Sequence, residues 1–193
     1  TVRVLWVKGS GSDLAMMTER DLAGLRLDDV LPLFERESLS DEAMVDYLAH
    51  CLFAPNSPRP SIETLMHAFV PHPHVDHTHP DAIVSLATCH EGERHIQRLY
   101  GERVGWIPYM RPGFTLSKAV GLLVRARPQL EGIVLGKHGL VCWGETARAC
   151  YETTIRLIQE AEDYIEAHAR GRVVFGEIRM PALEASQRMQ VLT

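Results

Sequence analysis

Two histidines separated by one residue, His77 and His79, are the residues whose types and spacing most directly indicate chemistry. Side chains alternate faces along an extended strand with a period of two, so both imidazoles of such a pair point to the same side. Zinc commonly takes three histidines and keeps its fourth position for water or substrate. His138, which lies between glycines and is flanked by apolar runs, is the best placed third ligand. The spacing therefore predicts a metal site made by these three residues.

Glu63 is the carboxylate that we expect beside this metal. Ser61 is a suitable N-cap for a helix that continues through Phe69, and Glu63 would then lie in the first turn, where the helix dipole favours a carboxylate. A carboxylate that does not bind the metal is free to act as an acid and a base. We therefore predict that Glu63 transfers a proton next to the ion.

The same histidines allow two other interpretations. Residues 72–79 hold four histidines among prolines, which is also the pattern of a polar surface loop without a metal. The pattern His-x-His-x-Asp-His of dinuclear metal hydrolases matches residues 77–81 but fails at Ala82. Because an interior histidine needs a partner, the apolar runs around His138 favour the mononuclear metal site over both.

The composition is that of an ordinary globular chain. With 193 residues, of which 46% are apolar, it can bury one core, and we predict a single domain over residues 1–193. A net charge of -5 and a pI near 6.0 argue against a nucleic-acid surface. Apolar runs are too short to span a bilayer, no secretory signal is evident, and the four cysteines have no C-x-x-C spacing. We therefore expect a cytoplasmic protein with neither nucleic acid nor membrane as a partner.

Alternating strands and helices are predicted to position these residues. A loop at residues 8–12 contains two glycines and exposes backbone N–H groups, so it could hold a phosphate. Apolar runs predict strands at 2–7, 132–135 and 140–143, and we also predict a strand at 74–79. Helical spacing predicts helices that begin near Ser40 and Ser61 and others at 82–89, 116–126 and 145–170.

Three segments in order resemble the signatures of the class II aldolase/adducin family, namely residues 60–67, 77–82 and 137–140. The Ser-Gly loop at 8–13 and the Leu-x-Leu-Asp segment at 25–28 are also similar to segments that precede these signatures, so the resemblance covers nearly the whole chain. Within the family, the chain looks most like the aldolase part of bifunctional rhamnulose-1-phosphate aldolase/alcohol dehydrogenases. It contains no dinucleotide-binding Gly-x-Gly-x-x-Gly unit, so any dehydrogenase would lie outside it.

The resemblance implies a fold, an assembly and a set of metal ligands. The fold would be a three-layer α/β/α arrangement with a mainly antiparallel central sheet, and the assembly a homotetramer with active sites at subunit interfaces. His77, His79 and His138 would bind Zn²⁺. Glu63 would be the acid/base, as the matching glutamate is in sugar-phosphate aldolases.

The resemblance also implies that Ser10, Gly11 and Ser61 contact a substrate phosphate. The chain departs from the family pattern at two points. It starts too late to contain the Gly-Asn loop that contributes to the phosphate pocket, and Ile62 stands where some aldolases carry a second serine. Either an N-terminal segment is missing from this chain, or phosphate binding is altered.

The implied reaction is that of a lyase in carbohydrate metabolism. A zinc-dependent class II aldolase would reversibly cleave a ketose 1-phosphate of the rhamnulose or fuculose type to dihydroxyacetone phosphate and an aldehyde such as lactaldehyde. Zinc would withdraw charge from the ketose oxygens as the carbon–carbon bond breaks. Tyr100 and Tyr109 are the candidates for a tyrosine proton donor.

Two other classes of function stay open. The same scaffold could serve a sugar-phosphate epimerase or a methylthioribulose-phosphate dehydratase, although a glutamate rather than an aspartate at position 63 disfavours the epimerase. A non-catalytic, adducin-like interaction module is the other alternative. The complete set of three histidines and Glu63 argues against it, because such a module has no need of them.

Overall fold

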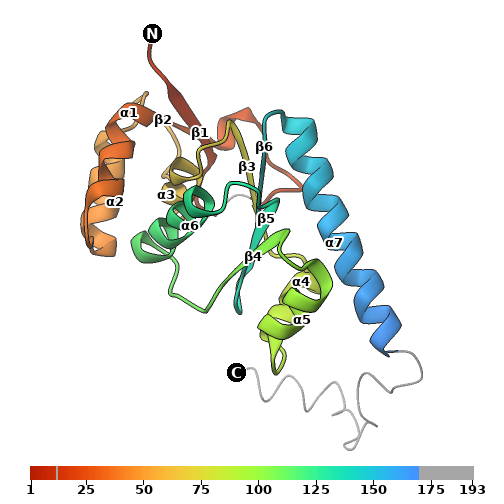
Figure 1. Ribbon diagram of the computed structural model, residues 1–193. Coiled ribbons are helices and arrows are strands. Elements are labelled where there is room, and N and C mark those ends of the chain that lie inside the picture. The colour runs from red at the N-terminus through yellow and green to blue at the C-terminus, as the bar shows by residue number, and fades with distance from the viewer. Residues whose placement is uncertain (12, 170–193) are drawn as a thin grey trace, which may run out of the picture.

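A four-stranded sheet forms the centre of the computed structural model, which describes residues 1–11 and 13–169 (Figure 1). Its strand order is β3-β6-β5-β4, with the bounds His74–Thr78, Gly139–Gly144, Gly132–Leu135 and Val104–Ile107. Both β3 and β5 run antiparallel to β6, and β4 runs parallel to β5. The predicted mainly antiparallel central sheet is confirmed for the described residues.

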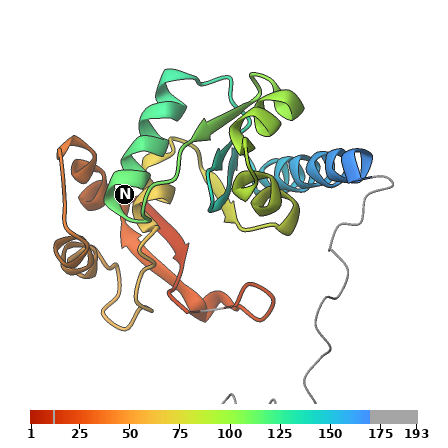
Figure 2. The same cartoon turned by 90° about the horizontal axis from the view of Figure 1, so that it is seen from below.

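Helices cover both faces of this sheet, as Figures 1 and 2 show. Along β6, Val141 and Trp143 face one helical layer, whereas Leu140 and Cys142 face the other, because successive side chains of a strand alternate. One layer contains α6 with α3 packed beside it, and the other contains α4, α5 and α7. The bounds are Phe114–Ala126, Thr64–Phe69, Asp81–Thr88, Gly92–Tyr100 and Ala147–Ala169. This is the three-layer α/β/α arrangement that was expected.

A second core lies around a two-stranded hairpin near the N-terminus. In it β1 (Val4–Lys8) pairs antiparallel with β2 (Leu22–Arg26), after the short helix η1 (Glu19–Asp21). The chain continues through α1 (Leu27–Val30), η2 (Leu31–Glu35) and α2 (Asp41–His50). Ser40 caps α2 as predicted, since its Oγ accepts a hydrogen bond of 3.2 Å from the backbone N–H of Ala43.

Helix α3 joins the two cores. Leu65 and Phe69 pack into the core around the hairpin, while Met66 packs under α6 against the central sheet. Because both sides of α3 are buried, the helix has a fixed place between the hairpin and the sheet. That place decides where Glu63, directly before the helix, can lie.

Several elements were not predicted from the sequence. They include the strands β2 and β4 and the helices α1, η2 and α5. Ser61 is not the N-cap of α3, which begins at Thr64 with Glu63 as its N-cap. Instead the Ser61 hydroxyl accepts a hydrogen bond of 3.2 Å from the backbone N–H of Glu63, within a turn that precedes the helix. Residue 170, the predicted end of the last helix, lies outside the described residues.

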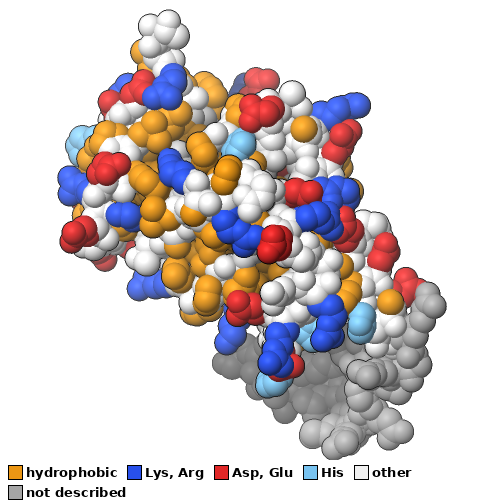
Figure 3. Space-filling view, in the orientation of Figure 1, with side chains coloured by type: hydrophobic (Ala, Val, Ile, Leu, Met, Phe, Trp, Pro, Cys, Tyr) orange, Lys and Arg blue, Asp and Glu red, His pale blue; other side chains and the backbone are white. Residues whose placement is uncertain are grey.

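The surface carries charges of both signs. On the face drawn in Figure 3, basic and acidic side chains are interspersed among apolar ones, and the described residues of that face form no continuous basic stripe. None of the described helices has both the length and the apolar character that crossing a membrane requires.

Candidate metal centre

The three predicted ligands and Glu63 lie together at one end of β3 and β6. One potential ligand atom from each of the four residues lies within 4.8 Å of all the others. The Nε2 atom of His77 is 3.2 Å from Nε2 of His79 and 3.3 Å from Nε2 of His138. Oε1 of Glu63 is 3.2 Å from Nε2 of His77 and 3.1 Å from Nε2 of His138. The fold thus gathers residues that are far apart in the sequence.

These separations match the edges of a tetrahedral metal site. Two nitrogen atoms, each about 2.05 Å from a tetrahedral zinc ion, are about 3.3 Å apart. Oε1 of Glu63 is buried and accepts no well-formed hydrogen bond from the described residues, although both Nε2 atoms are near it. Three imidazoles and one carboxylate are also a donor set that suits Zn²⁺. Glu63 therefore lies close enough to bind the ion directly, whereas a role beside the ion was predicted.

The sheet gives His77 its orientation and its tautomer. His77 is paired with Val141 of β6, so its side chain points to the layer that contains α3. Its Nδ1 atom lies 3.0 Å from the carbonyl oxygen of Leu140. Since a carbonyl oxygen only accepts hydrogen bonds, Nδ1 carries the proton and Nε2 keeps its lone pair for a metal.

His138 reaches the site from a tight turn between β5 and β6. Lys137 has a φ of 57°, a left-handed conformation, and the backbone N–H of His138 donates a hydrogen bond of 3.0 Å to the carbonyl of Leu135. This turn directs the imidazole of His138 back toward β3. Nδ1 of His138 is buried and has no partner among the described residues.

Gly139 is a residue of the site that the sequence predictions missed. A Cβ atom at this position would lie 2.5 Å from the carbonyl oxygen of Thr78 and 2.6 Å from Cδ2 of His79. The start of β6 can therefore approach the histidine pair only because residue 139 has no side chain. A glycine directly after a candidate ligand was the sequence signal for this requirement.

The electrostatics of the cluster favour a cation. Burial alone would raise the pKa of Glu63, but the neighbouring imidazoles of His138 and His77 outweigh burial and hold this pKa well below the ordinary value. The pKa of His79 is lowered, chiefly by burial and then by the charges of His77 and His138. At neutral pH the cluster therefore contains an ionised carboxylate and a neutral imidazole at His79, as metal binding requires.

A cavity of about 500 Å³ lies beside the cluster. Glu63, His77 and Ser61 form part of its polar wall, and the hairpin β1–β2 and the first half of α7 form an apolar wall that includes Trp6 and Ile155. Clefts of this size commonly hold small-molecule ligands. Two hollows of similar volume, about 560 and 520 Å³, lie elsewhere, and no residue of the cluster lines them.

The structure brings the predicted phosphate-binding residues near one another. The backbone N–H of Ser10 donates a hydrogen bond of 2.9 Å to the carbonyl of Arg59, and Gly9 forms a β-bridge with Pro60, directly before Ser61. Ser61 lines the cavity, whereas Ser10 and Gly11 are exposed and do not line it. The loop thus lies next to the segment that leads into the cavity.

Neither candidate tyrosine lines the cavity beside the cluster. Tyr100 on α5 is 3% exposed, and its hydroxyl donates a hydrogen bond of 2.5 Å to the carbonyl of Leu157 on α7. Burial raises the pKa of Tyr100 far above its usual range. Tyr109, which follows β4, is 60% exposed. Tyr100 is thus a packing residue within its own chain.

Comparison with known proteins adds to this geometry. The sequence matches the family described as the class II aldolase and adducin N-terminal domain over residues 1–165. This chain is a member of the class II aldolase and adducin family. The four clustered residues lie within the matched region, so membership covers the whole candidate site.

Three relatives place this family member among known proteins. It is 51% identical over 191 residues to an uncharacterised oxidoreductase, YuxG, of Bacillus subtilis (strain 168), and the match covers 99% of this chain but 28% of that protein's length. The N-terminal class II aldolase domain of a conserved protein from Thermoplasma acidophilum has a TM-score of 0.79 and 41% identity, over 84% of this chain and 75% of that one. L-fuculose-1-phosphate aldolase from Thermus thermophilus shares the fold, with a TM-score of 0.55 and 16% identity over 89% and 81% of the two chains.

Proposed function

We propose that this chain is a zinc-dependent aldolase that reversibly cleaves a ketose 1-phosphate to dihydroxyacetone phosphate and an aldehyde. The observation that carries the proposal is the convergence of three histidine Nε2 atoms with the Glu63 carboxylate beside a cavity of about 500 Å³. Family membership supports an enzyme of the aldolase type, and the shared fold of an L-fuculose-1-phosphate aldolase supports a sugar phosphate as the substrate class. A ketose of the rhamnulose or fuculose type, which yields lactaldehyde, is the first substrate to test.

Each residue of the cluster has a role in this proposal. His77, His79 and His138 hold the ion, which when bound supplies a Lewis acid for the charge that develops on the substrate oxygens. In the direction of synthesis Glu63 accepts the proton that leaves the hydroxymethyl carbon of dihydroxyacetone phosphate, and in cleavage it returns a proton to the same carbon. The depressed pKa of Glu63 keeps the carboxylate ionised in the resting site, ready to accept that proton.

The phosphate-binding role is assigned to Ser61 together with the neighbouring loop. The hydroxyl of Ser61 lines the cavity, and the backbone N–H groups of Ser10 and Gly11 belong to a loop that pairs with the segment just before Ser61. We extend the proposal to a cytoplasmic homotetramer, on the strength of the family resemblance and the composition.

Metal content and turnover of purified protein test this proposal together. The wild-type chain should hold close to one zinc ion per chain and release dihydroxyacetone phosphate from a ketose 1-phosphate. His79→Ala should lose both the metal and turnover, whereas Glu63→Gln should keep the metal and lose about 10²- to 10⁴-fold in kcat. His74→Ala is the matched control, because His74 is exposed on the same strand and outside the cluster.

The results also separate the alternatives. Full metal occupancy in His79→Ala would remove His79 from the ligand set. Turnover of sugar phosphates without release of dihydroxyacetone phosphate would indicate an epimerase or a dehydratase. A wild-type chain that binds no divalent metal would leave the interaction module as the better interpretation.

A further inference from the structure

Lys8 brings a positive charge to the cavity beside the metal cluster, and the proposed function leaves it without a role. The side chain is half-buried at the end of β1. Among the described residues that line this cavity, Lys8 is the only lysine or arginine, whereas Glu63 and Asp76 contribute carboxylates. A phosphate that enters the cavity is repelled by these carboxylates, so its binding there favours a cation close by.

The hairpin β1–β2 directs the side chain of Lys8 toward this cavity. Side chains alternate along β1, so Val7 is buried in the core around the hairpin, whereas Trp6 and Lys8 lie on the opposite face. Lys8 is paired with Leu22 of β2, and both residues line the cavity together with Trp6. The pairing of the two strands therefore fixes the face on which the lysine lies.

A second pairing brings Lys8 opposite Ser61. Gly9 forms an antiparallel β-bridge with Pro60, and in this register Lys8 and Ser61 are the next opposite positions. Residues at opposite positions of an antiparallel pair point to the same face, with Cβ atoms about 4.5–5.5 Å apart. Both residues line the cavity, as this register requires. The ammonium group of Lys8 and the hydroxyl of Ser61 can therefore contact the same bound group.

The position of the ammonium group agrees with this register. Nζ of Lys8 donates a hydrogen bond of 3.1 Å to the carbonyl oxygen of Gly9, at the start of the loop that contains Ser10 and Gly11. The close approach of this loop to the segment before Ser61 depends on Gly9, because a Cβ there would lie 2.8 Å from Cβ of Pro58. An ammonium group has three N–H donors, so its bond to the Gly9 carbonyl is compatible with a contact to a phosphate oxygen.

We propose that Lys8 is a phosphate-binding residue, which holds the substrate phosphate together with Ser61 and the adjacent loop. This inference rests on the proposed function, because it names the cation that recognises the phosphorylated end of the ketose. Ser61 precedes Glu63 by two residues, and both line the cavity with His77. A phosphate held between Lys8 and Ser61 therefore lies at the same end of the cavity as the proton-transfer group, as the phosphorylated half of the substrate requires.

Binding of dihydroxyacetone phosphate, compared with binding of dihydroxyacetone, tests the proposal without turnover. In calorimetric titrations of the zinc-loaded protein, Lys8→Met should bind dihydroxyacetone phosphate about 10- to 100-fold more weakly than wild type, the effect of losing one charge-assisted hydrogen bond. Dihydroxyacetone, which lacks the phosphate, should bind both proteins with equal affinity. Lys8→Arg keeps the charge and should recover most of the lost affinity.

Cleavage kinetics give a second readout that a merely structural role would not produce. The ratio of kcat/KM for L-fuculose 1-phosphate to kcat/KM for L-fuculose should fall about 10- to 100-fold in Lys8→Met. The change should appear mainly as a higher KM for the phosphorylated ketose, because the phosphate is bound alike before and during bond cleavage. A general distortion of the site would lower both kcat/KM values and leave their ratio unchanged.

The binding measurements separate this inference from the proposed function. Equal affinities of wild type and Lys8→Met for dihydroxyacetone phosphate would overturn the role of Lys8, and so would an equal loss of affinity for both compounds. If Lys8→Met does not fold, Lys8→Gln gives the same comparison. A wild-type chain that binds dihydroxyacetone phosphate through Lys8 and cleaves no ketose 1-phosphate would refute the proposed reaction alone.

Lys118 provides a matched control. It is also a half-buried lysine whose ammonium group donates a hydrogen bond to a backbone carbonyl, that of Arg36. It lies on α6, however, and does not line the cavity beside the cluster. Lys118→Met should therefore leave the affinity for dihydroxyacetone phosphate unchanged, and a loss as large as that of Lys8→Met would contradict a specific contact.

Discussion

Replacing Gly139 by alanine should abolish the metal site without altering any ligand. The added Cβ would lie 2.5 Å from the carbonyl oxygen of Thr78 and 2.6 Å from Cδ2 of His79. To reach the 3.4 Å of an ordinary contact, the start of β6 and the end of β3 must separate by about 0.9 Å. A zinc site tolerates errors of only about 0.2 Å in its ligand distances. The methyl group thus forces a displacement several times larger than the site can absorb.

Two measurements follow the effect of this substitution. The affinity for zinc, from competition with a chelating dye, should fall by at least the 10- to 100-fold that is typical for changes next to metal ligands. The free energy of unfolding of the metal-free protein should fall by about 1–3 kcal/mol, because the added methyl group overpacks a site with backbone on one side. Retro-aldol turnover should fall in proportion to the zinc that is lost.

Gly101→Ala is the control for a general loss of stability. Gly101 has a φ of 61°, so an alanine there strains the backbone by about 1–3 kcal/mol, but no described atom lies within 4 Å of the added Cβ. This variant should be destabilised and should still bind zinc with wild-type affinity. A folded Gly139→Ala protein with unchanged zinc affinity would refute the argument from close approach.

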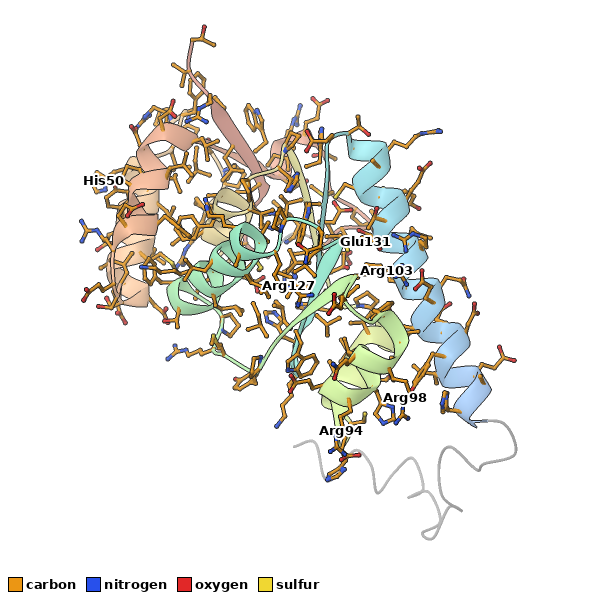
Figure 4. All side chains as sticks on the ribbon, viewed as in Figure 1. His50, Arg94, Arg98, Arg103, Arg127 and Glu131 are labelled. Carbon is orange, nitrogen blue, oxygen red and sulfur yellow. The ribbon has the colours of Figure 1, made fainter. Side chains whose placement is uncertain are left out.

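Three further predictions concern pH, a buried hydroxyl and an ion-pair network. The pKa of His67 is lowered from 6.5 to about 4 in the folded chain, so the unfolded chain binds this proton more tightly. The free energy of unfolding of the metal-free protein should therefore fall by up to about 3 kcal/mol as the pH drops from 6.5 to 4. In urea titrations, His67→Gln should reduce that fall. Tyr100→Phe removes the buried hydroxyl that bonds to Leu157 and should cost about 1 kcal/mol of stability with kcat unchanged, whereas a lower kcat would restore Tyr100 as a proton donor. Arg103, beside Glu131 in Figure 4, pairs with Glu131 and Glu160. Because these side chains are partly exposed, Arg103→Met should lower the free energy of unfolding by only about 1 kcal/mol. A loss of stability that does not shrink in high salt would contradict an electrostatic origin.

The cluster of candidate ligands could be predicted from the sequence because its signals are local. The spacing of His77 and His79 on a strand and the apolar runs around His138 are readable without a structure. His67 lines the cavity beside the cluster and was not predicted as part of the site, although its spacing of four residues from Glu63 was visible. The cavity is formed by several elements, and their meeting in space leaves no mark in the sequence.

The helices and strands likewise divide into those that local sequence signals predict and those that they do not. Strands β5 and β6 and helix α7 were predicted, because long apolar runs and a sustained helical period specify them. Helix α5 was missed, since most of its residues are polar and its N-cap, Glu91, adopts a left-handed φ of 62° and makes no side-chain cap. The apolar pair Ile96 and Tyr100, spaced by four residues, was the signal that could have found it.

Strand β2 could not be predicted from local sequence signals. Its sequence, Leu22–Arg26, contains an alanine and a glycine that do not favour strands. The segment is extended because β1 pairs with it and because Leu25 is completely buried in the core around the hairpin. Gly24 is needed there, since a Cβ would lie 2.9 Å from the ring of Trp6. Tertiary pairing therefore overrides the weak local preference.

The candidate ligand His77 depends on a strand that is held from both layers. As the edge strand of the described sheet, β3 has backbone groups on its outer side that β6 does not pair, and such strands are easily distorted. Val75 packs into the core on the side of α3 and α6, and Asp76 accepts a hydrogen bond of 3.1 Å from the hydroxyl of Thr154 in α7. Because consecutive residues of a strand face opposite layers, these two contacts hold the strand on both faces just before His77. The geometry of the candidate metal site therefore depends on both helical layers as well as on its own four residues.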